Sequence, residues 1–335
     1  MYYTADVKDI PPEDSSAGTV YGTDHPAGYQ PDPGLVDAVN VALGLDRPLL
    51  VTGEPGTGKT QLASSVAWQL ARRKLLNIAS ANVEKFETKS TSVARDLFYS
   101  FDTLRRFQAA YTKGSDNNVD YLTYNALGRS LLNAMPLADV APLVSADFDY
   151  AGPVRSVVLI DEIDKAPRDF PNDLLNEIDQ MFFRIPELKN VQIGGTGKLK
   201  DEYRPLVFIT SNSEKNLPDP FLRRCIFYNI PFPDPERLQE ILLARLARLS
   251  ALKGPLVADA LRFFLELRDN NVTKRKISPA ELIQWQSYML SRKANPAHPL
   301  KAAGEIARAG ISALAKDPDD LERVRTALDA FLSRK

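Results

Sequence analysis

The sequence predicts an α/β fold, in which helices cover both faces of a parallel sheet, followed by an all-helical region. Three observations carry this prediction. Runs of four apolar residues at Val157–Ile160 and Leu206–Ile209 are typical of parallel strands that helices cover on both faces. A glycine-rich stretch at 51–60 lies between a short apolar strand and residues with helical periodicity. After residue 235 the helical periodicity continues without any strand signal.

Length and composition narrow the class of protein. The chain has 335 residues, enough for one large core and a smaller one. Its 42 Lys+Arg and 43 Asp+Glu give a net charge of −1, so no overall basic excess indicates nucleic acid or an anionic membrane. With Cys225, His25 and His298 as the only residues of their kinds, a disulfide framework is excluded and a Cys/His metal site is disfavoured. We see no signal peptide and no run of about twenty apolar residues, and expect a soluble cytoplasmic protein.

The glycine-rich stretch fits the phosphate-loop pattern Gly-x-x-x-x-Gly-Lys-Thr. Glycines let successive backbone N–H groups converge on phosphate oxygens at a helix N-terminus. Lys59 is predicted to neutralise the β and γ phosphates, and the Thr60 hydroxyl to ligate Mg²⁺. The predicted nucleotide-binding residues are Gly53, Glu54, Pro55, Gly56, Thr57, Gly58, Lys59, Thr60 and Gln61.

The N-terminal 34 residues are rich in proline and glycine and are predicted to form an irregular arm. Its tyrosines either pack over a nucleotide base or, as we favour, pin the arm to the core. They are Tyr2, Tyr3, Tyr21 and Tyr29. A helix is expected at Gly34–Leu43 and a strand at Val83–Glu87.

A long helix is predicted after residue 92 from an apolar stripe at helical spacing. The stripe consists of Val93, Leu97, Phe101, Leu104 and Phe107. The arginines beside this stripe face elsewhere and are most simply a solvated face, with a role in a ring pore or in partner binding as the alternative. They are Arg95, Arg105 and Arg106. The sequence of 111–152 is less regular and contains a loop-like tract with several prolines.

The second sharp motif is Val157–Asp164, where a buried strand ends in carboxylates. Such groups are costly at a strand end unless they are used or solvated. In phosphoryl transfer to water, Asp161 would hold Mg²⁺ through water, and Glu162 would orient or deprotonate the attacking water. A merely solvated acidic turn is the alternative, and the phosphate loop makes it the weaker one.

A helix at Asp169–Met181 and a hairpin at 182–193 follow. The next strand, Leu206–Ile209, delivers Asn212 to the carboxyl edge of the sheet, where open α/β sheets bind ligands. Asn212 is therefore a candidate for contact with the γ-phosphate or the attacking water. Arg223 and Arg224 precede the last strand, and are either surface charges or, in a ring, groups that reach a neighbour's site.

A proline cluster at 231–235 marks the boundary to a helical domain. Apolar stripes predict its helices in the segments Leu238–Leu249, Leu256–Leu267, Leu282–Leu290, Ile306–Leu314 and Leu321–Leu332. We thus predict an arm at 1–34, an α/β ATPase domain at 35–230 and a helical domain at 231–335.

The order of these motifs resembles the AAA+ ATPases, most closely the MoxR-like group, from about residue 28 to the end. The resemblance implies a P-loop NTPase with a three-layer αβα parallel sheet of order 5-1-4-3-2, a C-terminal helical lid, ATP and Mg²⁺ as cofactors, and a hexameric ring. It also implies a partner with a von Willebrand factor A domain. By position Asn212 is similar to the sensor-1 residue, and Arg224, or next Arg223, to the arginine finger.

One departure from the family pattern concerns the lid arginine, which often follows a Ser-Pro pair. After Ser278 and Pro279 this sequence has Ala280, so Arg275 or Lys276 takes the role or the role is absent. Three functions stay open. The favoured one is a chaperone-like ATPase that remodels a protein partner; the alternatives are a nucleic-acid motor subunit and a slow nucleotide-gated switch.

Overall fold

The computed structural model describes residues 1–6, 10, 25–112, 115–246 and 254–334. They form two compact units. The first contains the described residues of the N-terminus, Pro31–Gly53 and Lys59–Ile230, and the second contains 25–30, Glu54–Gly58 and the described residues from Pro231 onward. Part of the predicted arm, with Tyr21, and the end of the predicted helix Leu238–Leu249 lie outside the described residues.

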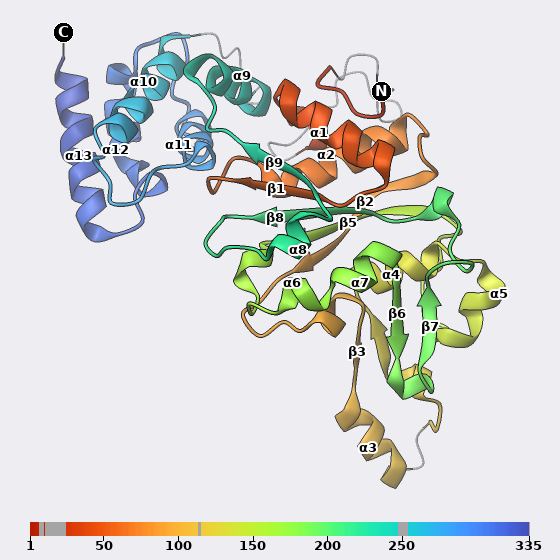
Figure 1. Ribbon diagram of the computed structural model, residues 1–335. Coiled ribbons are helices and arrows are strands. Elements are labelled where there is room, and N and C mark those ends of the chain that lie inside the picture. The colour runs from red at the N-terminus through yellow and green to blue at the C-terminus, as the bar shows by residue number, and fades with distance from the viewer. Residues whose placement is uncertain (7–9, 11–24, 113–114, 247–253, 335) are drawn as a thin grey trace. The chain divides into compact units, whose positions relative to one another are not determined.

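A five-stranded parallel sheet forms the centre of the first unit (Figure 1). Its strands are β1 (Leu49–Gly53), β2 (Ile78–Glu87), β5 (Arg155–Asp161), β8 (Leu206–Ser211) and β9 (Ile226–Ile230). The spatial order is β2-β5-β8-β1-β9. When these five strands are numbered 1 to 5 in chain order, the spatial order read from β9 is 5-1-4-3-2. The expected strand order is therefore confirmed. The central strands β5 and β8 are buried along nearly their whole length, as their unbroken apolar runs predict.

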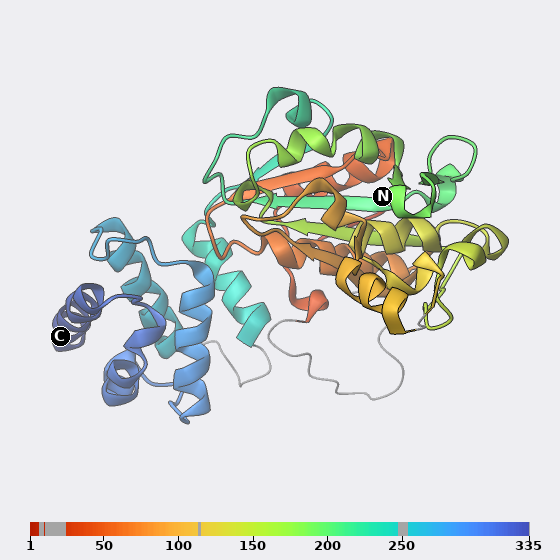
Figure 2. The ribbon, with the colours of Figure 1, turned by 90° about the horizontal axis from the view of Figure 1, so that it is seen from below.

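Helices lie on both faces of this sheet and complete the three layers (Figures 1 and 2). Figure 1 shows α1 and α2 on one face and α4, α6, α7 and α8 on the other. The helices of the first unit are α1 (Pro33–Leu45), α2 (Lys59–Arg72), α3 (Thr103–Thr112), α4 (Ala126–Asn133), α5 (Leu137–Val140), α6 (Phe170–Asp173), α7 (Leu175–Gln180) and α8 (Asp219–Leu222). Two short antiparallel pairs accompany them, β3 (Tyr99–Phe101) with β4 (Leu122–Tyr124), and β6 (Phe182–Ile185) with β7 (Val191–Gly194). The hairpin expected at 182–193 is therefore confirmed.

The long helix predicted from the stripe beginning at Val93 is wrong. A 3-10 turn at Ala94–Leu97 leads into β3, and only Thr103–Thr112 forms an α-helix. The physical reason is that Leu97, Phe98 and Tyr99 are buried in succession, which a one-faced helix does not allow. The rings of Phe98 and Tyr99 both pack against Phe183, with centroids 5.0 and 6.0 Å away. Contacts from a distant part of the chain thus override the local periodicity.

Two other predicted helices are shorter than expected. The segment Asp169–Met181 is interrupted at Leu174, between α6 and α7. The segment Ile306–Leu314 is interrupted at Gly310, where glycine disfavours a helix. A Cβ at Gly310 would lie 2.6 Å from the Tyr288 ring, so the close approach of α11 (Pro279–Ser291), which carries Tyr288, explains the glycine.

The described residues of the second unit form helices joined by loops and contain no strand (Figure 2). Its α-helices are α9 (Pro235–Leu246), α10 (Pro255–Asp269), α11 (Pro279–Ser291), α12 (Gly304–Ala309) and α13 (Pro318–Ser333). Trp285 is fully buried at their centre, and the Phe263 ring packs against both Trp285 and Phe331. Across the described chain, every helix falls short of the length and apolar character that crossing a bilayer requires.

Candidate functional site

The phosphate loop joins β1 to α2, so the strand and helix expected around it are present. Gly56 and Gly58 have φ angles of 78° and 88°, a left-handed conformation that favours glycine. Lys59 begins α2, and its ammonium donates a hydrogen bond of 2.8 Å to the Gly53 carbonyl. Thr60 and Gln61 follow in the first turn of the same helix. The loop therefore ends at a helix N-terminus, whose N–H groups and dipole favour a bound phosphate.

The tip of this loop, Glu54–Gly58, belongs to the second unit. Within that unit the Arg268 guanidinium pairs with the Glu54 carboxylate at 2.8 Å and lies 3.7 Å from the centre of the Phe232 ring. Sequence reasoning missed Arg268. Its two candidates for a lid cation, Arg275 and Lys276, are both exposed. Lid-sensor roles for these residues stay a prediction.

Two arm tyrosines are buried. The Tyr3 hydroxyl lies 3.0 Å from the Ser65 hydroxyl of α2, as the pinning interpretation expects. Tyr29 is close to the phosphate loop within the second unit, because a Cβ on Gly58 would lie 2.9 Å from its ring.

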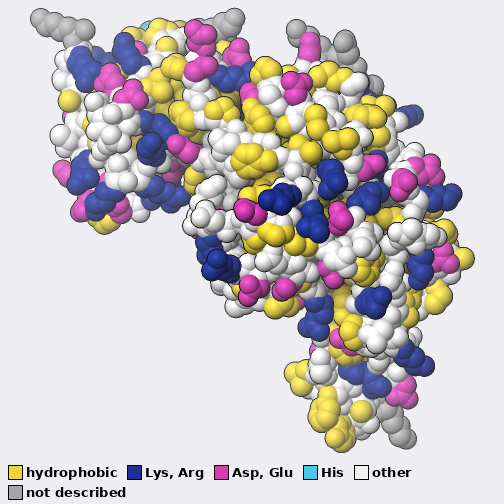
Figure 3. Space-filling model, viewed as in Figure 1, with side chains coloured by type: hydrophobic (Ala, Val, Ile, Leu, Met, Phe, Trp, Pro, Cys, Tyr) yellow, Lys and Arg dark blue, Asp and Glu magenta, His cyan; other side chains and the backbone are white. Residues whose placement is uncertain are grey.

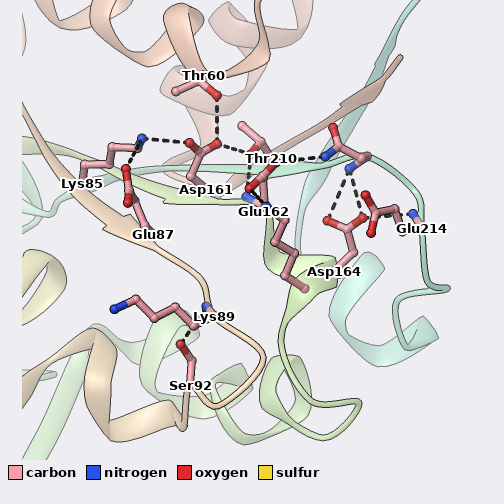
Figure 4. A network of polar contacts seen from close by, with 12 residues as sticks. Thr60, Lys85, Glu87, Lys89, Ser92, Asp161, Glu162, Asp164, Thr210 and Glu214 are labelled. Carbon is pink, nitrogen blue, oxygen red and sulfur yellow. Dashed lines mark hydrogen bonds and ion pairs between the residues drawn. The ribbon is translucent and has the colours of Figure 1, made fainter. Parts of the chain in front are cut away.

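Asp161 ends β5 and receives polar groups on both carboxylate oxygens (Figure 4). Oδ1 accepts hydrogen bonds from the hydroxyls of Thr60 at 2.9 Å and Thr210 at 2.6 Å, while Oδ2 is 3.1 Å from the Lys85 ammonium. Burial raises the pKa of the Asp161 carboxyl, but the bonds from Thr210, Lys85 and Thr60 outweigh burial, and the net pKa lies below its ordinary value. Asp161 is therefore ionised and next to Thr60, as expected for the two predicted metal ligands.

Glu162 follows Asp161 in a left-handed backbone conformation, with φ of 57°. Its N–H donates to the Thr210 hydroxyl at 2.8 Å, which holds the turn in place. The Asn212 side-chain amide donates to Glu162 Oε1 at 3.1 Å, and the Lys165 ammonium pairs with Oε2. The structure thus brings Glu162 and Asn212 together at the carboxyl edge of neighbouring strands.

A third acid, Asp164, fixes the loop that carries Asn212 (Figure 4). Its buried carboxylate accepts hydrogen bonds from the backbone N–H groups of Asn212 at 3.1 Å and Glu214 at 3.0 Å. A buried carboxylate needs such donors, because desolvation without them is costly. Sequence reasoning assigned Asp164 no role. The sequence feature that could have indicated Asp164 is its place as the third carboxylate in the segment 161–164.

Electrostatics link Lys59 to these carboxylates. Burial lowers the pKa of the Lys59 ammonium from its ordinary value, and the negative charges of Asp164, Glu162 and Asp161 act in the opposite direction. A polyanion bound at the loop would add further negative charge near Lys59 and strengthen its protonation.

The two predicted arginines lie outside this group. They follow α8, where Arg223 is exposed and Arg224 donates a hydrogen bond of 3.1 Å to the Pro220 carbonyl. In the described part of the chain, no ion pair or hydrogen bond joins either arginine to Lys59, Glu162 or Asn212. An action on a neighbouring subunit's site stays a prediction.

Thr60 and Asp161 fit a magnesium ion in chemical type. Mg²⁺ prefers oxygen ligands and usually takes one or two from protein, with phosphates and water supplying the others. The described residues contain no cluster of three His, Cys, Asp or Glu residues arranged to hold a metal by themselves. With Thr60 and Asp161 as protein ligands, nucleotide phosphates and water would supply the remaining ligands of a magnesium ion.

The Lys59–Thr60 end of a phosphate loop, next to the carboxylates at the edge of an α/β sheet, is typical of a nucleoside-triphosphate-binding protein. A sequence model of the ATPase family associated with various cellular activities (AAA) matches residues 49–233. The chain belongs to this family and is an ATPase. AAA proteins bind nucleotides and commonly oligomerise as rings. The match covers all five strands of the main sheet.

No curated protein matches this chain. Similar solved structures include a Thermotoga maritima RuvB variant, at 14% identity and TM-score 0.41, covering 85% of this chain and 68% of that one. Domain III of the T. maritima replication initiation protein DnaA is 16% identical with TM-score 0.44 and coverages of 88% and 99%. Caenorhabditis elegans PCH-2 is 18% identical with TM-score 0.39 and coverages of 88% and 63%. The family assignment rests on the sequence model.

Proposed function

We propose that this ATPase is a magnesium-dependent, MoxR-like chaperone that assembles as a hexameric ring in the cytoplasm and remodels a partner protein. Lys59 and the loop N–H groups would bind the phosphates, and Thr60 and Asp161 would hold a magnesium ion, which would stabilise charge on the phosphates. Glu162 accepts the proton of the attacking water, and Asn212 positions the Glu162 carboxylate through its 3.1 Å hydrogen bond.

The exposed apolar side chains of α3 favour a protein partner. No residue of this helix is buried, and Leu104, Phe107 and Tyr111 are 67%, 61% and 76% exposed. Their spacing places them on one side of the helix. In Figure 1, β3 leads down to α3 at the bottom of the view. Figure 3, drawn from the same side, shows hydrophobic side chains gathered at this lower end.

Two arginines of α3 lie beside a tyrosine of the same unit. The guanidinium groups of Arg105 and Arg106 are 5.6 and 5.7 Å from the centre of the Tyr121 ring, although Arg105 is exposed. Arg106 also donates to the Asn118 side chain at 2.9 Å. An apolar helix face of this kind fits a hydrophobic groove on another protein. The net charge of −1 of the chain disfavours the nucleic-acid motor.

The phosphate-binding part of the proposal predicts that Lys59→Ala weakens ATP affinity about 10- to 100-fold, the usual magnitude for a lost hydrogen bond to a charged group. Equilibrium titration with a fluorescent ATP analogue measures the effect. Lys74→Ala is the matched control, because Lys74 lies beyond the end of α2. Equal affinity in Lys59→Ala and the parent would contradict the assignment.

The partner is tested by affinity capture with Glu162→Gln, which should hold ATP and remain on its client. We expect a protein carrying a von Willebrand factor A domain, recovered with ATP and lost when Lys59→Ala is added. Phe107→Ser in the same background should reduce recovery at least about tenfold, in line with the loss of a buried aromatic anchor. Gln108→Ser on the same helix is its control. ATP-dependent recovery of nucleic acid in place of protein would favour the motor alternative.

A further inference from the structure

Lys85 occupies a position at the candidate metal carboxylate that the nucleotide-binding motifs do not account for. It lies on β2, which pairs in parallel with β5, and Glu87 is the register partner of Asp161. Alternation along β2 places Lys85 and Glu87 on the same face. The Lys85 ammonium lies 2.8 Å from Glu87 Oε1 and 3.1 Å from Asp161 Oδ2 (Figure 4). It thus bridges two carboxylates.

The two oxygens of Asp161 differ in their partners. Oδ1 accepts from the hydroxyls of Thr60 and Thr210, which are neutral groups, and Oδ2 contacts the cation of Lys85. The Asp161 side chain is 11% exposed, so water screens this pair only in part. In the nucleotide-free protein the charge of Asp161 is therefore already compensated by the protein's own ammonium group.

A divalent cation that approaches Asp161 and Thr60 meets this ammonium. Like charges repel strongly where solvent is partly excluded, so Lys85 opposes the binding of a free metal ion. A metal that arrives on a triphosphate brings its own negative charges, which offset the repulsion. Glu87 is 72% exposed and gives the Lys85 ammonium a second partner when its contact with Asp161 weakens.

We propose that Lys85 is a positioning residue that acts as an internal counter-cation: it occupies Asp161 in the nucleotide-free protein, and restricts metal binding to the metal–nucleotide complex. Asp161 then passes from Lys85 to the incoming metal, while Glu87 retains the ammonium. The inference rests on the proposed role of Asp161 as the metal carboxylate. It explains why a lysine stands beside that carboxylate on the adjacent strand.

The test measures binding of Mn²⁺ alone to nucleotide-free protein, by the loss of the electron paramagnetic resonance signal of the free ion. We expect no saturable binding to the parent below about millimolar Mn²⁺, and at least about tenfold tighter binding to Lys85→Met, since one unit of opposing charge is removed. Lys85→Arg should retain the suppression. Lys89→Met is the matched control, because Lys89 lies on the same segment and its backbone N–H, not its ammonium, makes the contact drawn in Figure 4.

Adding Asp161→Asn to Lys85→Met should abolish the gained Mn²⁺ binding. Equal Mn²⁺ affinity in the parent and in folded Lys85→Met would overturn the inference, and Lys85→Gln repeats the comparison if Lys85→Met unfolds at a lower temperature. The magnesium dependence of ATP affinity in Asp161→Asn separates the two proposals. If Asp161→Asn loses the magnesium dependence of ATP affinity while Lys85→Met shows no gain in Mn²⁺ affinity, only the role of Lys85 is wrong. If the magnesium dependence is unchanged in Asp161→Asn, the metal assignment of Asp161 is wrong.

Discussion

Glu162→Gln should bind ATP with nearly the parental affinity and hydrolyse it about 10²- to 10⁴-fold more slowly, the usual contribution of a positioned general base. The amide keeps the shape of the side chain but cannot accept the proton of the attacking water. Single-turnover hydrolysis, together with equilibrium binding of ATP, separates the chemical step from affinity.

The surroundings of Glu162 sharpen this expectation. Asn212 and Lys165 both contact its carboxylate, and an amide keeps an oxygen for the Asn212 donor but loses the ion pair with Lys165. Glu214→Gln is the matched control, because only the backbone N–H of Glu214 takes part in the bond to Asp164. A decrease smaller than about tenfold in Glu162→Gln would show that another group activates the water.

Arg224→Ala should bind ATP but lose about 10³- to 10⁵-fold in turnover, the contribution of an arginine supplied to the γ-phosphate from a neighbouring subunit. Within the described residues, the Arg224 guanidinium donates a hydrogen bond of 3.1 Å to the neutral Pro220 carbonyl of its own chain. A neutral partner of this kind does not neutralise the guanidinium. Activity of the parent should also rise more than linearly with protein concentration, because each site needs two subunits.

Mixing Arg224→Ala with Glu162→Gln should restore part of the activity. In a mixed ring, some sites combine an intact Glu162 from one subunit with an intact Arg224 from the next. The controls are the two variants assayed separately, each at the total protein concentration of the mixture. Parental turnover of Arg224→Ala in an assembled ring would make the assignment wrong, and Arg223→Ala would then be examined in the same way.

The nucleotide-binding framework was predictable because its signals are local. The glycines of the phosphate loop mark a backbone that needs positive φ, and the apolar run before Asp161 marks a strand covered on both faces. Asn212 follows from the same reasoning, since parallel strands deliver their carboxyl ends to one edge of the sheet. In each case a few consecutive residues carry the whole argument. The strand order, which the family resemblance implied, and the helical second unit, which the apolar stripes predicted, are both observed.

Tertiary contacts determined the features that local sequence patterns did not predict. The stripe through Leu97 and Leu104 has helical spacing, yet burial against Phe183 gives β3 and leaves the apolar face of α3 exposed. The ion pair between Lys85 and Asp161 joins two residues that lie far apart in the sequence. No periodicity encodes such a pairing, because it depends on which strands become neighbours and in which register. The strands could be read from the chain, but their partners were set by the packing of the whole sheet.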